Sequence, residues 1–112
     1  MRRKLKKIGR RKAANALVDY KRRLHGILRV IGGSGATRES IAKRLADGGS
    51  PVSRSSVTRW MTPSSRAVPD TFQLLAIAEL APDVSLDWLL GRRSAQSATE
   101  KFIESELANW LQ

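Results

Sequence analysis

The apolar residues between Ala13 and Ile31 recur every three or four positions, which is the spacing of one face of an α-helix. They are Leu17, Tyr20, Leu24, Ile27, Leu28 and Ile31. The positions between them carry the polar residues Lys21, Arg22, Arg23 and Arg29. This pattern predicts an amphipathic helix over residues 13–31, which ends at the flexible sequence Gly-Gly-Ser-Gly of residues 32–35.

Two further helices are marked by residues whose side chains can accept a hydrogen bond from the free amides of a first helical turn. Thr37 would cap a helix that runs to about Ala46, and Ser53 would cap a short helix over 53–61. The inner faces of these two helices would be formed by Ile41, Ala42, Leu45, Val57, Trp60 and Met61.

The helical pattern continues beyond residue 68. Pro69-Asp70 opens a helix through about Leu80 that is apolar on more than one side, which is typical of a helix at the centre of a core. Ser85 would cap a short helix over 86–90, which Gly91 ends. No stretch of useful length alternates as a strand does, so the predicted fold class is all-α. The apolar residues of the expected central helix are Phe72, Leu74, Leu75, Ile77 and Ala78.

A last helix is predicted from Ser97, because the residues from Ser97 to Glu100 match a capping box. Its apolar face either folds back on its own domain or contacts a second copy of the chain. We favour a dimer contact, because large aromatic side chains beside a charged face are typical of interfaces. The residues of this face are Phe102, Ile103, Leu107, Trp110 and Leu111.

Charge divides the chain into two unequal halves. The formal net charge is +11, and it separates into +15 for residues 1–66 and −4 for residues 67–112. The densest basic run, residues 1–12, contains no acid and predicts a flexible arm that meets a polyanion such as DNA, although a merely solubilising tail has the same composition. The basic residues of the arm are Arg2, Arg3, Lys4, Lys6, Lys7, Arg10, Arg11 and Lys12.

The composition argues against several classes of protein. The chain has no cysteine and a single histidine, His25, so thiolate and multi-histidine metal sites lose their usual ligands. No residue set supplies a nucleophile with its base, so we expect neither an enzyme nor a cofactor. No apolar run approaches the ~20 residues of a membrane-spanning helix, and the basic start lacks a following apolar region. We expect a cytoplasmic protein associated with the nucleoid.

Three stretches together resemble a known family. They are RESIAKRL at 38–45, VSRSSVTRW at 52–60 and VSLDWLLG at 84–91. The first two resemble the helix-turn-helix of lambda-repressor-like proteins of the Cro/CI or XRE type, and the third is similar to the ending of many such domains. The resemblance covers about residues 13–91, and residues 1–12 and 92–112 lie outside it. It implies a five-helix DNA-binding domain, to which this chain adds the arm and the amphipathic C-terminal helix.

The helix over 53–61 carries the candidate chemistry. Its outer positions hold residues that can donate hydrogen bonds and no acid, and the resemblance implies that they face base edges in the major groove. They are Arg54, Ser55, Thr58 and Arg59. The resemblance also implies contacts of Arg38, Ser53 and Arg66 with the DNA backbone. Arginine is best suited to the N7 and O6 edge of guanine.

The chain departs from the family at residues 47–51, which lengthen the turn between the two motif helices by about five residues. Two consequences are open. The insertion either changes the angle of the helix over 53–61, or it offers the free amides of Gly48, Gly49 and Ser50 as a DNA-backbone contact of its own.

These observations lead to a main hypothesis and two alternatives. The main one is a sequence-specific regulator of transcription, a repressor as is common in the family, which binds palindromic double-stranded DNA as a homodimer. The first alternative is an antitoxin-type module whose last helix covers a protein partner while the motif represses its own promoter. The second is non-specific DNA or RNA binding by the arm.

Overall fold

A computed structural model describes the backbone of residues 2–110 and the side chains of residues 15–110. All regular elements in the described range are α-helices, which confirms the predicted all-α class. They are α1 (Arg2–Gly32), α2 (Arg38–Asp47), α3 (Arg54–Met61), α4 (Thr71–Leu80), α5 (Leu86–Leu89) and α6 (Ala98–Trp110).

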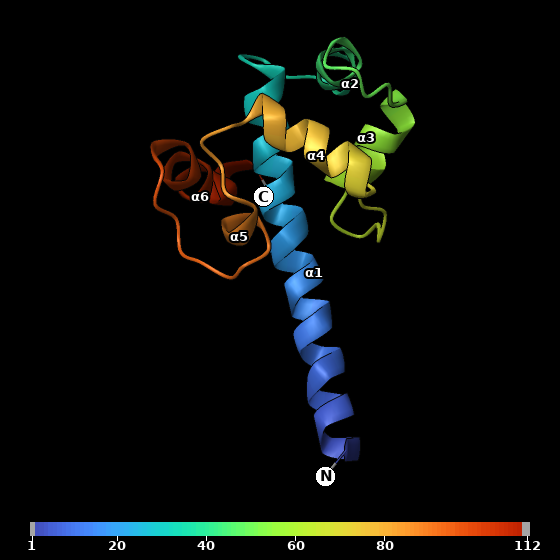
Figure 1. The fold of residues 1–112 in the computed structure, drawn as a ribbon, viewed down its shortest axis with the longest axis vertical. Coiled ribbons are helices and arrows are strands. Elements are labelled where there is room, and N and C mark those ends of the chain that lie inside the picture. Colours follow the sequence, from blue (N-terminus) through green and yellow to red (C-terminus); the bar gives the residue numbers. More distant parts are fainter. Residues whose placement is uncertain (1, 111–112) are drawn as a thin grey trace.

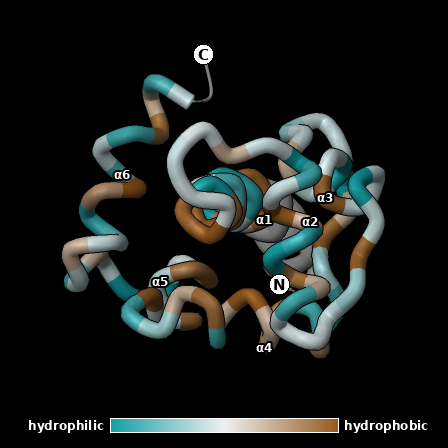
Figure 2. Tube along the Cα trace, turned by 90° about the horizontal axis from the view of Figure 1, so that it is seen from above, coloured by the Kyte–Doolittle hydropathy of each residue, from teal (hydrophilic) through white to brown (hydrophobic). Residues whose placement is uncertain are grey.

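Helix α1 is the axis of the fold, and the other helices surround its C-terminal half (Figure 1). Seen along α1, helices α2 and α3 lie on one side of it and α6 lies on the opposite side (Figure 2). Helix α4 crosses α1 between these two sides (Figure 1). The longest dimension of the molecule, 49 Å, follows α1, whose N-terminal half extends beyond the other helices.

Helix α1 begins at Arg2, so the predicted helix start at Ala13 is wrong. The physical reason is that Lys and Arg are good helix formers, and a single glycine, Gly9, does not end a helix that continues on both sides. The backbone of residues 2–12 therefore continues α1. The side chains of the basic arm lie outside the described side chains, and their contact with a polyanion stays a prediction.

The predicted helix starts after residue 32 are confirmed to within one residue. Thr37 accepts a hydrogen bond from the Ser40 amide at 3.0 Å, and Asp70 accepts one from the Gln73 amide at 2.8 Å. In both cases the third helical residue bonds back to the cap, which completes a capping box. Ser85 likewise accepts a bond from the first turn of α5.

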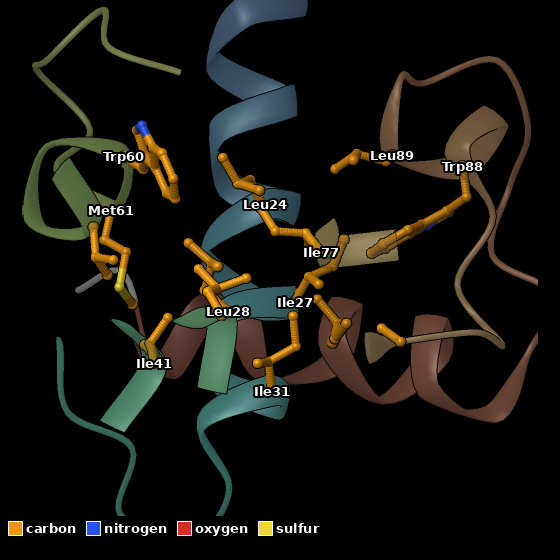
Figure 3. Packing of buried hydrophobic residues seen from close by; sticks show 14 residues of the cluster. Leu24, Ile27, Leu28, Ile31, Ile41, Trp60, Met61, Ile77, Trp88 and Leu89 are labelled. Atoms are coloured by element: carbon orange, nitrogen blue, oxygen red, sulfur yellow. The ribbon is translucent and has the colours of Figure 1, made fainter. Parts of the chain in front are cut away.

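One core joins all six helices (Figure 3). Helix α1 contributes four apolar side chains with no more than 5% exposure, and the other five helices pack theirs against them. The inner faces predicted for α1, α2 and α3 are therefore confirmed in their central residues. The buried apolar side chains are Leu24, Ile27, Leu28, Ile31, Ile41, Leu45, Val57, Trp60, Met61, Ile77, Ala81, Trp88, Leu89 and Ile103.

Helix α4 is not the centre of the core, and the prediction that it would be is wrong. Ile77 is its one fully buried side chain, whereas Phe72 is 83% exposed and Leu75 is 50% exposed. The reason is its position across the outside of α1, where only one side of α4 packs against the core (Figure 1). The apolar residues on its other side face solvent.

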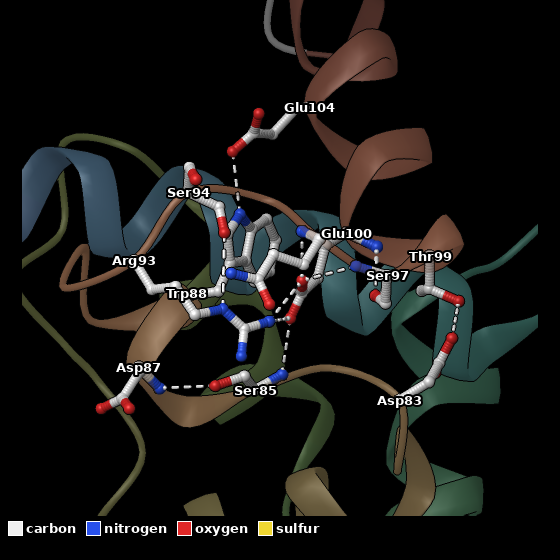
Figure 4. Close-up of polar contacts among 11 residues, drawn as sticks. Asp83, Ser85, Asp87, Trp88, Arg93, Ser94, Ser97, Thr99, Glu100 and Glu104 are labelled. Atoms are coloured by element: carbon white, nitrogen blue, oxygen red, sulfur yellow. Dashed lines mark hydrogen bonds and ion pairs between the residues drawn. The ribbon is translucent and has the colours of Figure 1, made fainter.

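Glu100 connects α6 to the preceding chain (Figure 4). Its carboxylate is fully buried and accepts hydrogen bonds from the amides of Gln96, Ser97 and Ser85 at 2.9, 3.0 and 2.7 Å. Nη2 of Arg93 donates to both of its oxygens at 2.8 and 3.0 Å. Burial alone would raise the pKa of Glu100, but these hydrogen bonds outweigh it and lower the pKa to about 2. The predicted capping box of α6 is confirmed and is part of this larger cluster.

Candidate nucleic-acid interface

Helix α3 has one buried and one exposed side. Val57, Trp60 and Met61 are buried against α1 and α2. On the opposite side Arg54, Ser55 and Arg59 are exposed, and Thr58 is half-buried. The four residues expected to read bases thus share the side of α3 that faces away from the core.

The polar side chains of this outer side differ in how many of their hydrogen-bond donors are already used within the protein. The Thr58 hydroxyl donates to the Arg54 carbonyl at 2.9 Å, so its proton is used within the helix. The Arg59 guanidinium makes a long contact of 3.4 Å from Nη2 to the Ser56 hydroxyl, which leaves its other donors for a ligand. Arginine donors are therefore more available on this surface than the threonine hydroxyl.

Arg54 is paired with Glu39, which sequence reasoning did not foresee. Nη1 of Arg54 lies 2.9 Å from Oε1 of Glu39, and the two side chains are 68% and 72% exposed. Glu39 is in the first turn of α2, and Arg54 is the first residue of α3. The pair depends on how α2 and α3 pack, and the sequence separation of 15 residues gives no local signal for it.

The residues expected to contact the DNA backbone are all on the surface. Arg38 is exposed at the start of α2, and Arg66 is exposed in the loop after α3. Ser53 is exposed and caps α3, because its hydroxyl oxygen accepts the Ser56 amide at 3.0 Å. The predicted cap is confirmed, and contact of these three residues with phosphate stays a prediction.

Lys21 fixes the C-terminal end of α3 to α1. It is 4% exposed, and its Nζ donates to the carbonyl oxygens of Arg59 at 3.0 Å, of Ala67 at 3.1 Å and of Ser65. Burial lowers the pKa of its ammonium group. One side chain thereby connects α1 to the last turn of α3 and to the loop that carries Arg66.

The expectation that Lys21 lies on the polar side of its helix is wrong. Lys21 follows Leu17 by four residues and precedes Leu24 by three, so it shares their face. This spacing was the available signal. The burial of Lys21 was still not predictable, because lysine is rarely buried unless several acceptors surround its ammonium group. Here the acceptors come from residues 38 to 46 positions away in sequence.

His25 makes a second polar contact between α1 and α3. Its Nδ1 lies 3.3 Å from the Met61 carbonyl, and its Nε2 accepts a hydrogen bond from Nε of Arg29 at 3.2 Å. Because Nδ1 faces a carbonyl, it is the nitrogen that carries the proton. Burial and the nearby charge of Arg29 lower the pKa of His25, although the carbonyl contact acts in the opposite direction. His25 is thus a buried residue that packs between α1 and α3.

The lengthened turn after α2 satisfies its own backbone groups. Gly49 has a φ of +89°, and the turn closes as a Schellman motif. The amides of Gly48, Gly49 and Ser50 donate to the carbonyls of Arg44, Ala46 and Leu45 at 3.1, 3.0 and 2.9 Å. The idea that these amides are free to bind a DNA backbone is therefore wrong. The extra residues extend the C-terminal cap of α2.

Helix α6 packs on its own domain, so Ile103 is withdrawn from the expected dimer contact. Its side chain is fully buried against Gly26 of α1, where a Cβ atom would overlap with it. Leu107 and Trp110 are partly buried against the same core, and the Arg29 guanidinium lies 5.1 Å from the Trp110 ring. Phe102 is 51% exposed. Leu111 lies outside the described residues.

Comparisons of the chain with known proteins found no match among family models, curated proteins or solved structures. In the part of the chain that the structure describes, no group of three or more histidine, cysteine or acidic residues is placed to hold a metal ion. None of the described helices is long and apolar enough to cross a membrane.

Proposed function

We propose that the protein is a sequence-specific double-stranded DNA-binding regulator of transcription with a lambda-repressor-like helix-turn-helix. In this proposal α3 enters the major groove, where Arg54 and Arg59 contact guanine and Ser55 and Thr58 contact neighbouring base edges. Arg38, Ser53, Arg66 and the basic arm contact phosphates and position α3.

The observation that carries the proposal is the two-sided environment of α3. Three buried side chains and the bonds from Lys21 and His25 hold its inner side, while its outer residues include two exposed arginines and no acid of α3 itself. A helix that served only to pack against the core would not require two arginines on its exposed side. An α-helix of this size fits the major groove, which is about 12 Å wide.

The first test is selection of binding sites from random duplex DNA, followed by affinity measurements on the selected site. We expect a palindromic motif whose half-sites are about 10 base pairs apart, as a homodimer requires. Light scattering on the protein with and without this site measures the dimer directly.

Single substitutions then assign the base contacts. Arg54→Ala and Arg59→Ala should each weaken binding to the selected site by about 5- to 100-fold and remove the preference at one base pair. Arg92→Ala is the matched control, because Arg92 is also exposed but lies after α5, away from α3. Unchanged binding by both α3 variants, together with loss of binding when the arm is neutralised, would instead establish non-specific binding by the arm.

A further inference from the structure

Glu39 places an acid on the surface that the proposed function turns toward DNA. Between residues 38 and 66 the chain holds Glu39 and Asp47 as its acids, among six basic residues. A carboxylate beside Arg54 repels phosphates and so lowers affinity for any DNA sequence. An acid at this point therefore needs a reason other than DNA affinity.

Stability supplies only a small part of that reason. Glu39 is in the first turn of α2, where the helix dipole favours an acid. Its bond to Arg54 is highly exposed on both sides, and ion pairs of this kind contribute little to folding. In the structure the pair orients one long side chain, that of Arg54 at the first position of α3.

The bond to Glu39 leaves one edge of the Arg54 guanidinium available for contact with a base. A guanidinium has five N–H donors in one plane, and Glu39 engages Nη1. The edge formed by Nε and Nη2 stays available for the two parallel hydrogen bonds that guanine accepts at N7 and O6. A side chain that is held in one orientation before binding loses less conformational freedom on binding.

We propose that Glu39 is a specificity-determining positioning residue, which holds the Arg54 guanidinium so that its other edge meets a guanine. This inference rests on the proposed function and deepens it, because it assigns sequence choice to a pair of residues on two helices. Glu39 lowers general DNA affinity and raises discrimination at one base pair.

The test uses the full chain and the site selected from random DNA. The base pair read by Arg54 is first identified as the one whose preference Arg54→Ala removes. Affinities for the selected site and for the site changed at that base pair are then measured for the wild type, Glu39→Gln and Asp47→Asn. Asp47→Asn is the matched control, since it removes one exposed acid from the other end of α2.

We expect Glu39→Gln to lower discrimination at that base pair about fivefold, while Asp47→Asn leaves it unchanged. Both variants should bind unrelated duplex DNA more tightly, because each removes a negative charge. In the Arg54→Ala background, Glu39→Gln should have no further effect on discrimination. A merely structural role of Glu39 would change the melting temperature without changing this ratio.

Three results would overturn the inference. Glu39→Gln that discriminates as well as Asp47→Asn would show that the pair does not position Arg54. Loss of preference at a different base pair would show that Glu39 contacts a base itself. A wild-type protein without any sequence preference would refute the proposed function, which the first two results leave intact.

Discussion

Lys21 shows how a single side chain can determine the position of a surface helix. Its ammonium group is buried, yet three backbone carbonyls from α3 and the following loop accept its protons. Each of these carbonyls belongs to a segment that carries a candidate DNA contact. The candidate interface is therefore supported from inside the domain by a residue that does not reach the surface.

Replacing Lys21 by methionine should destabilise the protein by about 2 to 4 kcal/mol, because the carbonyls lose their donor in a buried place while the aliphatic stem is kept. Urea unfolding measures the change. Arg22→Met is the control, since Arg22 is exposed one residue later and should change stability by less than about 0.5 kcal/mol. Equal effects of the two substitutions would show that the buried bonds contribute nothing.

Glu100 makes stability depend on acidic pH. Its pKa is about 2 in the folded protein and 4.5 in a free chain, so the unfolded state takes up a proton first as the pH falls. The stabilisation, about 3 kcal/mol, is complete above about pH 4.5 and is lost as the pH falls toward 2. Urea unfolding at several pH values should show Glu100→Gln less stable than the wild type at pH 6, with the difference shrinking toward pH 2. A difference that does not change with pH would contradict this origin.

At the scale of elements, α6 is held by close contact with α1. Gly26→Ala places a methyl group where the Ile103 side chain now lies, and the shift of α6 should cost about 1 to 2 kcal/mol despite the better helix propensity of alanine. Unfolding of the double variant Gly26→Ala, Ile103→Ala provides the control. Ile103→Ala should be less harmful in the Gly26→Ala background than alone, and additive effects would exclude the contact.

The helix starts after residue 32 were predictable because their signals are local. Thr37, Ser53, Asp70, Ser85 and Ser97 each accept hydrogen bonds within the next few residues, and all five are caps in the structure. The exposed side of α3 was also predictable from a local pattern. The apolar residues of α3 recur at helical spacing on one side, which leaves the polar residues on the other.

Features that depend on packing between distant segments were not predictable. The burial of Lys21, the exposure of Phe72 and the pairing of Glu39 with Arg54 all follow from which helix sides meet. The packing of α6 on its own domain, and not on a second copy, also depends on which helix sides meet. Gly26 could have suggested a close helix approach, but glycine in a helix does not identify its partner.

At the scale of the whole molecule, the two charge halves have different positions. The basic half contains α1, which begins with the basic arm, together with α2 and α3. The acidic half contains α4, α5 and α6, and α6 lies opposite α2 and α3 across α1 (Figure 2). Such a charge distribution orients the basic side toward a polyanion.

Replacing the eight basic residues of the segment 1–12 by glutamine should reduce the salt dependence of DNA binding. The slope of log affinity against log salt concentration should become shallower by about 0.9 for each phosphate that the arm neutralises. The base preference should be unchanged, because α3 is unaltered. Loss of the base preference in this variant would contradict the proposed division of labour between the arm and α3.

The central claim, that α3 reads bases in the major groove, is tested most directly by methylation interference on the selected site. Methyl groups at guanine N7 lie in the major groove, and those at adenine N3 lie in the minor groove. We predict interference at guanine N7 in two patches about 10 base pairs apart, with one position in each patch losing its interference in Arg54→Ala. Interference at adenine N3 alone, or at no position, would contradict the account.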